Sequence, residues 1–235
     1  MDFDYAIAFM SRDWIIANSL SLLYLIICLL VGKYSSKKNI ELFAKVFVCL
    51  FIVIYFIYHM LHIYEGTWTL NKRLPLHLCG ITSVITCFIL FIDKKQFWFE
   101  FLFYAGILGG LNALYTPLID NYTGVDFFYY EYFYSHTSII ILPLYMYYYM
   151  GMSLSKYSWL KSFLFINILL VIIMPIDFLI DANYMYLKNP PEVDHPLVSG
   201  EWPYYLVNLE FAVLFLLYFT YSLFKTPILK NKKSI

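Results

Sequence analysis

Apolar residues occur in seven long runs that are separated by short polar connectors. Each run is about as long as the roughly 20 helical residues that cross the hydrocarbon core of a bilayer. The predicted spans are 14–32, 41–63, 75–92, 97–117, 132–150, 159–181 and 203–224. Because the connectors leave no room for a soluble domain, we expect an all-α polytopic helix bundle of about seven transmembrane helices, with residues 1–235 as a single transmembrane domain.

The composition supports this interpretation. The chain is 62% apolar and only 14% charged, and a soluble domain of this size needs more polar surface than that. We therefore predict a multi-pass protein of the cell membrane, and the abundance of Lys, Ile, Phe and Tyr favours a bacterial plasma membrane. A formal net charge of zero does not indicate a nucleic-acid partner.

The basic residues predict the orientation of the spans. With the N-terminus outside and the C-terminus inside, 12 of the 16 Lys and Arg residues fall on the inner side. The four on the outer side are Arg12, Lys72, Arg73 and Lys188. Because cytoplasmic loops carry an excess of Lys and Arg, this orientation is the favoured one.

Polar groups within the spans are concentrated near the outer side. A pore needs polar groups along its whole length, so a one-sided group predicts a cavity that opens to the outer leaflet. Polar groups in hydrocarbon are costly and are usually retained for function. The residues concerned are His59, His62, His77, Cys79, Asn112, Thr116, His136, Asp177, Asp181, Asn208 and Glu210.

Cys79 is the strongest candidate for covalent chemistry. If Pro75 is the first helical residue of the third span, Cys79 lies one turn further on, near the positive helix terminus. That terminus and a nearby imidazole would favour the thiolate, which is the nucleophilic form. His77 lies about 200° around the same helix from Cys79. We therefore expect the base to be His136, from the fifth span. The alternatives are a small buried thiol and a histidine bonded to a carbonyl group.

Other polar residues support two different interpretations. Asn112 and Thr116 are four residues apart on one helical face, where they could orient a histidine, donate to an oxyanion or form ordinary helix–helix hydrogen bonds. His59 and His62 are three apart and share a face, so they could bind zinc together with His77 or His136.

Several sequence blocks resemble a known family. The chain is similar to the YwaF-type bacterial integral membrane proteins, which resemble a mammalian multi-pass acyltransferase acting on ether phospholipids. The blocks are Leu74-Pro75-Leu76-His77-Leu78-Cys79, Leu114-Tyr115-Thr116-Pro117, Tyr134-Ser135-His136, Asn183-Tyr184-Met185-Tyr186-Leu187-Lys188-Asn189-Pro190 and Trp202-Pro203-Tyr204-Tyr205.

The resemblance implies a membrane acyltransferase. Cys79 would be the acyl-accepting nucleophile and His136 the general base, with supporting roles for His77, Asn112, Thr116 and Asn183. The acyl chain would pass from a membrane phospholipid, through a cysteine thioester, to a lysolipid or a lipoprotein amine at the outer leaflet, and to water in a hydrolase. This mechanism implies no cofactor. The alternatives are a zinc-dependent lipid hydrolase or amidase, with His59, His62, His77 and His136 as ligands, and a non-enzymatic lipid-binding or transport protein.

Overall fold

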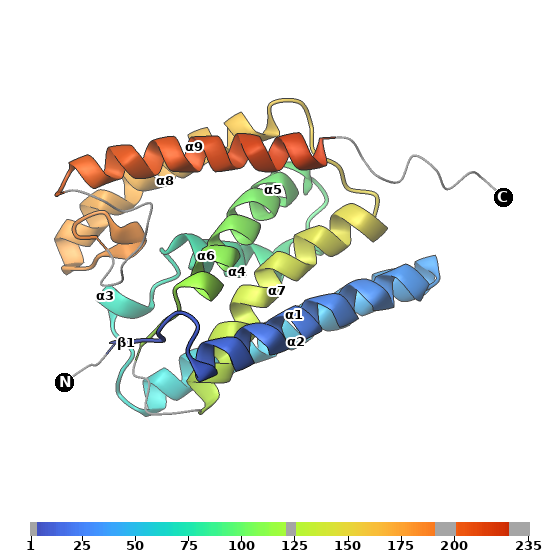
Figure 1. The fold of residues 1–235 in the computed structure, drawn as a ribbon, viewed down its shortest axis with the longest axis horizontal. Helices are drawn as coiled ribbons and strands as arrows, with labels where there is room; N and C mark the ends of the chain where they lie inside the picture. Colours follow the sequence, from blue (N-terminus) through green and yellow to red (C-terminus); the bar gives the residue numbers. More distant parts are fainter. Residues whose placement is uncertain (1–3, 121–125, 191–200, 226–235) are drawn as a thin grey trace.

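The helices form one bundle in the computed structural model, which describes residues 4–120, 126–190 and 201–225 (Figure 1). The elements are β1 (Asp4–Ala6), α1 (Arg12–Tyr34), α2 (Lys37–Tyr64), α3 (Leu70–Arg73), α4 (Leu78–Phe88), α5 (Gln96–Phe101), the π-helix η1 (Leu102–Gly106), α6 (Ile107–Tyr115), β2 (Leu118–Asp120), α7 (Phe127–Tyr149), α8 (Ser158–Ile180), the 3₁₀-helix η2 (Tyr184–Tyr186) and α9 (Tyr204–Phe224).

Each predicted span contains a helix, so the all-α prediction is confirmed. Among the described residues, five helical segments are long and apolar enough to cross a membrane: α1, α2, the continuous α5–η1–α6 segment, α8 and α9. The other two spans correspond to α7, which has 23 residues and is rich in tyrosine, and to α4, which has only 11. The predicted start of the third span is wrong, because the helix begins at Leu78 and not at Pro75.

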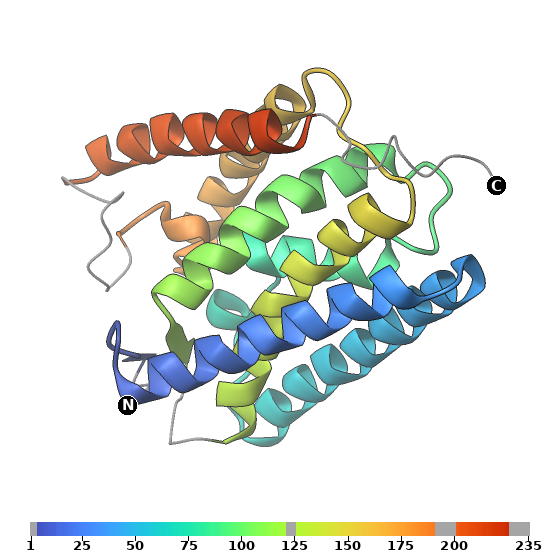
Figure 2. The ribbon, with the colours of Figure 1, turned by 45° about the vertical axis from the view of Figure 1, so that its right-hand side comes forward.

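Helix α7 is the centre of the bundle. It packs against α1, α2, α4, α6 and η1, and Figure 2 shows it between the α1–α2 pair and the α8–α9 pair. The side chain of Asp126 caps its first turn by accepting hydrogen bonds from the backbone N–H groups of Phe128 and Tyr129. Phe128, Tyr129 and Phe133, near the start of α7, are buried in the core.

The outer helices expose most of their apolar surface. Only 17% of the apolar window of α8 and 11% of that of α9 is buried, against 61% for α5–η1–α6. Exposed apolar helix surface of this extent is expected for a helix that faces lipid.

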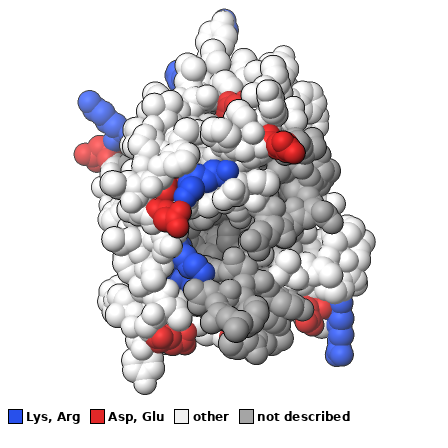
Figure 3. All heavy atoms as spheres, turned by 90° about the vertical axis from the view of Figure 1, so that its left-hand side faces the viewer, with Lys and Arg blue, Asp and Glu red and all other residues white. Residues whose placement is uncertain are grey.

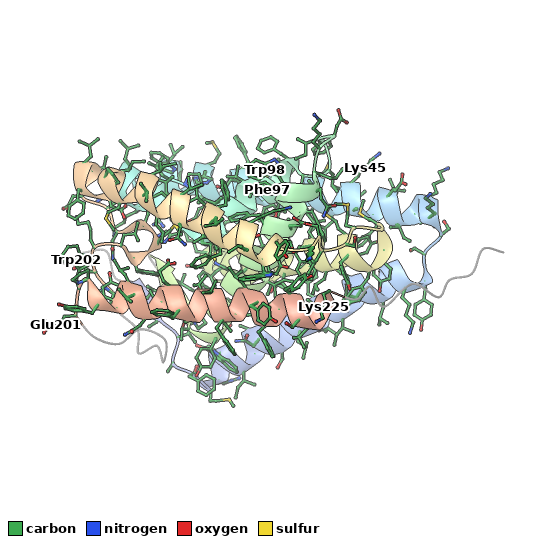
Figure 4. All side chains as sticks on the ribbon, turned by 90° about the horizontal axis from the view of Figure 1, so that it is seen from above. Lys45, Phe97, Trp98, Glu201, Trp202 and Lys225 are labelled. Atoms are coloured by element: carbon green, nitrogen blue, oxygen red, sulfur yellow. The ribbon has the colours of Figure 1, made fainter. Side chains whose placement is uncertain are left out.

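The helix ends gather at two opposite ends of the bundle. Glu201 and Trp202 lie at one end, whereas Lys45 and Lys225 lie toward the other (Figure 4). The short antiparallel pairing of β1 with β2 joins the start of the chain to the segment after α6. Helices α4, α7 and α9 begin at the end that carries Trp202, and the basic residues predict that this end is outside.

Candidate functional site

The predicted cavity is present at the end of the bundle where α4 begins. It has a volume of about 1350 Å³ and is lined by α4, α6, α7, α8, α9 and the segment after α8. Lys and Arg side chains gather near the centre of this end face, together with Asp and Glu (Figure 3). Six predicted site residues line this one cavity, namely Cys79, His136, His77, Asn112, Thr116 and Asn183.

Cys79 is closer to a helix terminus than the sequence predicted. Because α4 begins at Leu78, Cys79 is its second residue, and the N-cap residue His77 forms no side-chain cap. The first N–H groups of an α-helix have no carbonyl partner within the helix. Ile81 donates to the His77 carbonyl, so the uncapped N–H groups at this terminus belong to residues 78–80. The thiol is therefore half-buried beside the positive end of α4.

Two glycines allow close packing around the start of α4. A Cβ atom at Gly109 of α6 would lie 3.2 Å from the Cys79 Sγ atom, so hydrogen at this position leaves space beside the sulfur. A Cβ atom at Gly80 would lie 2.9 Å from the Pro75 Cα atom. Glycine at position 80 thus lets the 74–77 segment cross close to the start of α4.

His136 is held in one tautomer. Its Nδ1 atom lies 2.7 Å from the carbonyl oxygen of Tyr132, one turn earlier in α7. Because a carbonyl oxygen only accepts hydrogen bonds, Nδ1 carries the proton and Nε2 of the neutral ring carries the lone pair. The predicted hydrogen bond of this histidine to a carbonyl group and its predicted availability as a base are therefore compatible.

Cys79 and His136 both lie next to α6. Gly109 faces Cys79, and the next residue, Gly110, would place a Cβ atom 2.7 Å from the backbone oxygen of His136. Tyr132 also lines the cavity, and its hydroxyl donates to the Ala113 carbonyl of α6 at 3.1 Å. Among the described residues, no hydrogen bond joins the Cys79 thiol to the His136 imidazole. The two residues line the same cavity, and both lie next to α6.

Asn112 and Thr116 have different environments. The Thr116 hydroxyl donates to the backbone oxygen of Asn112, at 3.2 Å, so it forms a bond within its own helix. The Asn112 side chain is exposed and lines the cavity, and it has no hydrogen-bond partner among the described residues. Of the two predicted donors, Asn112 is the one whose amide group remains available to a ligand.

Asn183 and His77 hold the segment after α8 against the cavity. The Asn183 side chain accepts from the N–H groups of Lys188 and Asn189 and donates to the Asn189 carbonyl. His77 Nδ1 accepts from the N–H group of Met185 at 3.2 Å. The Asn183 amide is thus committed to this segment and not to a ligand.

An ion pair joins the two ends of the same segment. Lys188 Nζ lies 2.6 Å from Asp181 Oδ1. The hydrogen bond from Lys188, and then its positive charge, hold the pKa of Asp181 below its usual value. The carboxylate is 94% exposed, so solvent screens the pair.

Three histidines of the zinc alternative, His59, His77 and His136, line the cavity, whereas the fourth does not. His59 Nδ1 accepts from Trp68 Nε1, whereas His62 is buried, with its Nδ1 atom 2.7 Å from Thr67 Oγ1 and its ring stacked on Phe128. His62 does not line the cavity. In the described part of the chain, no three His, Cys, Asp or Glu residues are placed to hold a metal ion.

Several polar residues that line the cavity were not in the predicted site. Glu131, which immediately precedes the predicted fifth span, is a buried residue of α7 that lines the cavity. Its spacing of four from Ser135, another lining residue, was the available signal. Asn167 of α8 donates to Glu210 of α9 at 3.0 Å, and both line the cavity deeper between the helices.

Comparison with known proteins supports a membrane family. A family model described as the TMEM164 family matches residues 8–221, which is nearly the whole chain. No curated protein and no solved structure shows significant similarity to the chain.

Proposed function

Because the chain belongs to the TMEM164 family of multi-pass membrane proteins, we propose that it is a membrane acyltransferase with a cysteine nucleophile. It works in the bacterial plasma membrane, and its substrates are membrane phospholipids. The observation that carries the proposal is that Cys79 and His136, which were selected from sequence alone, line the same cavity.

The first half-reaction loads the protein. His136 Nε2 takes the proton of the Cys79 thiol, and the thiolate attacks the carbonyl carbon of a phospholipid ester. The ester C–O bond breaks, the acyl chain remains on sulfur as a thioester, and the proton returns from His136 to the oxygen of the departing lysolipid. Because the Nδ1–H group donates to the Tyr132 carbonyl throughout, the ring keeps the orientation that presents Nε2.

The second half-reaction unloads it. The hydroxyl group of a lysolipid, or the amine of a lipoprotein, attacks the thioester carbonyl while His136 takes its proton. The carbon–sulfur bond breaks, the sulfur leaves as a thiolate, and His136 returns the proton to it. Water in place of the acceptor makes the same steps a hydrolysis.

Backbone donors suit the charge that develops on the carbonyl oxygen. The N–H groups of Cys79 and Gly80 belong to the uncapped first turn of α4, and such groups stabilise an oxyanion when they point to its position. The Asn112 amide is a third donor that lines the cavity. Removing one oxyanion donor typically slows an acyl transfer about 100-fold or more.

Acyl trapping tests the proposal. The protein in nanodiscs is incubated with a phospholipid whose acyl chain carries an alkyne, and label retained on the denatured protein is measured. We expect label that hydroxylamine releases, that disappears in Cys79→Ala, and that forms about 100-fold more slowly in His136→Ala, which removes the general base.

Cys49 provides the matched control, since it is an exposed free cysteine of α2 that does not line the cavity. Cys49→Ala should label like the unmodified protein. Label that persists in Cys79→Ala removes this thiol from the mechanism. Tight binding of the lipid without any label would favour the non-enzymatic lipid-binding alternative.

A further inference from the structure

We propose that the cavity has a lateral opening between α6 and α9 through which a phospholipid of the adjoining leaflet inserts one acyl chain. The proposal deepens the proposed function, because it states how the substrate reaches Cys79. It needs only the cavity and no covalent step.

Helix α9 is fixed at its two ends. At the end that carries Trp202, the Tyr205 hydroxyl donates to the Tyr186 carbonyl, and Trp202 Nε1 donates to the Leu187 carbonyl at 3.0 Å. At the other end, Tyr147 donates to the Phe224 carbonyl at 2.9 Å. Between these anchors, the most extensive contacts of α9 are with α8. Leu209, Val213 and Leu216 in the middle of α9 line the cavity.

The rims of the opening are apolar and accessible. Leu111 and Tyr115 of α6 line the cavity and are 52% and 43% exposed. On the α9 side, Leu209 and Val213 line the cavity. The two helices border the same cavity but are not among the elements that pack extensively against each other, so the wall between α6 and α9 is open toward lipid.

The depth of the cavity matches one leaflet. Its α9 wall extends from Leu206 to Leu217, which is about 17 Å of helix at roughly 1.5 Å per residue. A leaflet contributes about half of a hydrocarbon core that is roughly 30 Å thick. A chain that stands parallel to its neighbours in the bilayer therefore fits the long dimension of the cavity. The deepest lining residues, Ile166, Leu216 and Leu217, are apolar, as such a chain requires. The polar residues of this part of the wall, Asn167 and Glu210, are hydrogen-bonded to each other.

The charged end of the cavity fits the headgroup of the same lipid. Lys72, Arg73 and Lys188 line the cavity at the end of the bundle that lies at the membrane surface. Guanidinium and ammonium groups pair well with phosphate oxygens. Cys79, at the start of α4, lies between this end and the apolar depth, where the ester of a lipid in this pose is located.

Photo-cross-linking tests the opening without acyl transfer. A phosphatidylcholine with a diazirine near the end of one chain is irradiated with the Cys79→Ala protein in nanodiscs, and the modified peptides are mapped. We expect adducts on Ile166, Val213 and Leu216. Leu111→Trp, which fills the opening from α6, should reduce them about fivefold or more. Val213→Trp should do the same from α9.

Leu164→Trp is the matched control, because Leu164 is 54% exposed on α8 but does not line the cavity. Its adducts should equal those of the parent protein. Adducts confined to the outward faces of α1 and α2, or equal losses in Leu111→Trp and Leu164→Trp, would overturn the lateral opening. Because Cys79 is absent from every sample, such a failure is distinct from a failure of the thiol mechanism.

Discussion

At the scale of single residues, two adjacent glycines have different consequences for the site. The Cys79 sulfur packs closely against Gly109, where a Cβ atom would lie 3.2 Å from it, whereas Gly110 is pressed against α7, where a Cβ atom would lie 2.6 Å from Ile140 Cγ1. Gly106 and Gly110 are four residues apart and both approach the α7 backbone closely. Small residues at this spacing let two membrane helices approach each other. Gly109 thus lets the Cys79 sulfur lie close to α6, and Gly110 lets α6 pack closely against α7.

Substituting Gly109 should affect the reaction more than the stability. In Gly109→Ala the new methyl group meets Sγ at 3.2 Å and displaces the sulfur from the position in which it attacks, so acyl labelling should fall roughly tenfold or more. The melting temperature should stay close to that of the parent protein, because the sulfur needs to yield by only a few tenths of an ångström. Unchanged labelling would show that the position of the sulfur against Gly109 does not matter for the reaction.

Gly110→Ala should show the reverse order of effects. Its methyl group meets the backbone oxygen of His136 at 2.7 Å, and backbone cannot move aside cheaply. We expect a loss of about 1–3 kcal/mol in stability, measured as a lower midpoint of thermal unfolding in detergent. A midpoint equal to that of Gly109→Ala would show that α6 and α7 are packed more loosely than the structure has them.

At the scale of elements, the segment after α8 is held by its own side chains in a costly backbone conformation. Asp181, Met185 and Tyr186 all have positive φ angles, which is uncommon outside glycine. The three hydrogen bonds of the Asn183 amide offset this cost. Since the segment lines the cavity, its order determines the shape of the charged end.

Removing the Asn183 amide should loosen that segment. Each lost hydrogen bond is worth about 0.5–1.5 kcal/mol, so trypsin should cleave after Lys188 faster in Asn183→Ala than in the parent protein. Asn183→Asp keeps an oxygen acceptor for two N–H groups and should be cleaved at an intermediate rate. Equal cleavage rates in all three proteins would assign the order of the segment to contacts other than this amide.

At the scale of the whole molecule, the two ends of the bundle differ in charge and in chemistry. The cavity opens at the end that carries Lys72, Arg73 and Lys188. Among the described residues, the larger number of lysines lies at the other end, in or beside the α1–α2, α4–α5 and α7–α8 connections and at Lys225. Every second connection is thus lysine-rich, which fixes the expected orientation through the membrane.

Reporter fusions test this orientation. We expect green fluorescent protein at the C-terminus to fluoresce in a bacterial host and alkaline phosphatase at the same site to be inactive, because the C-terminus is predicted to be inside. The same pair after residue 122, in the connection between α6 and α7, should give the opposite result. An active C-terminal phosphatase would place the cavity on the cytoplasmic side.

Much of the fold follows from the sequence because hydropathy is a local property. Each predicted span matches a helix to within a few residues, apart from the third and fifth, and the depth of the polar groups predicted where the cavity lies. Cys79 and His136 could be selected for the same reason, since a polar group in an apolar run is visible without any contact being known. Asn112 was likewise visible, whereas the burial of Glu131 was not, because it depends on helices that are distant in the sequence.

The start of α4 was decided by tertiary contacts and not by local rules. Pro75 suits the first position of a helix, but the Leu74 N–H donates to the Tyr184 hydroxyl at 2.9 Å, and His77 bonds to Met185. These contacts hold the 74–77 segment in a turn outside the helix, so the helix begins three residues later and Cys79 moves to its terminus. The sequence determined which groups lie in the membrane and at what depth, because each span is apolar by itself. Only the packing of distant segments determined which of those groups meet, because a hydrogen bond between Leu74 and Tyr184 cannot be recognised from the sequence around either residue.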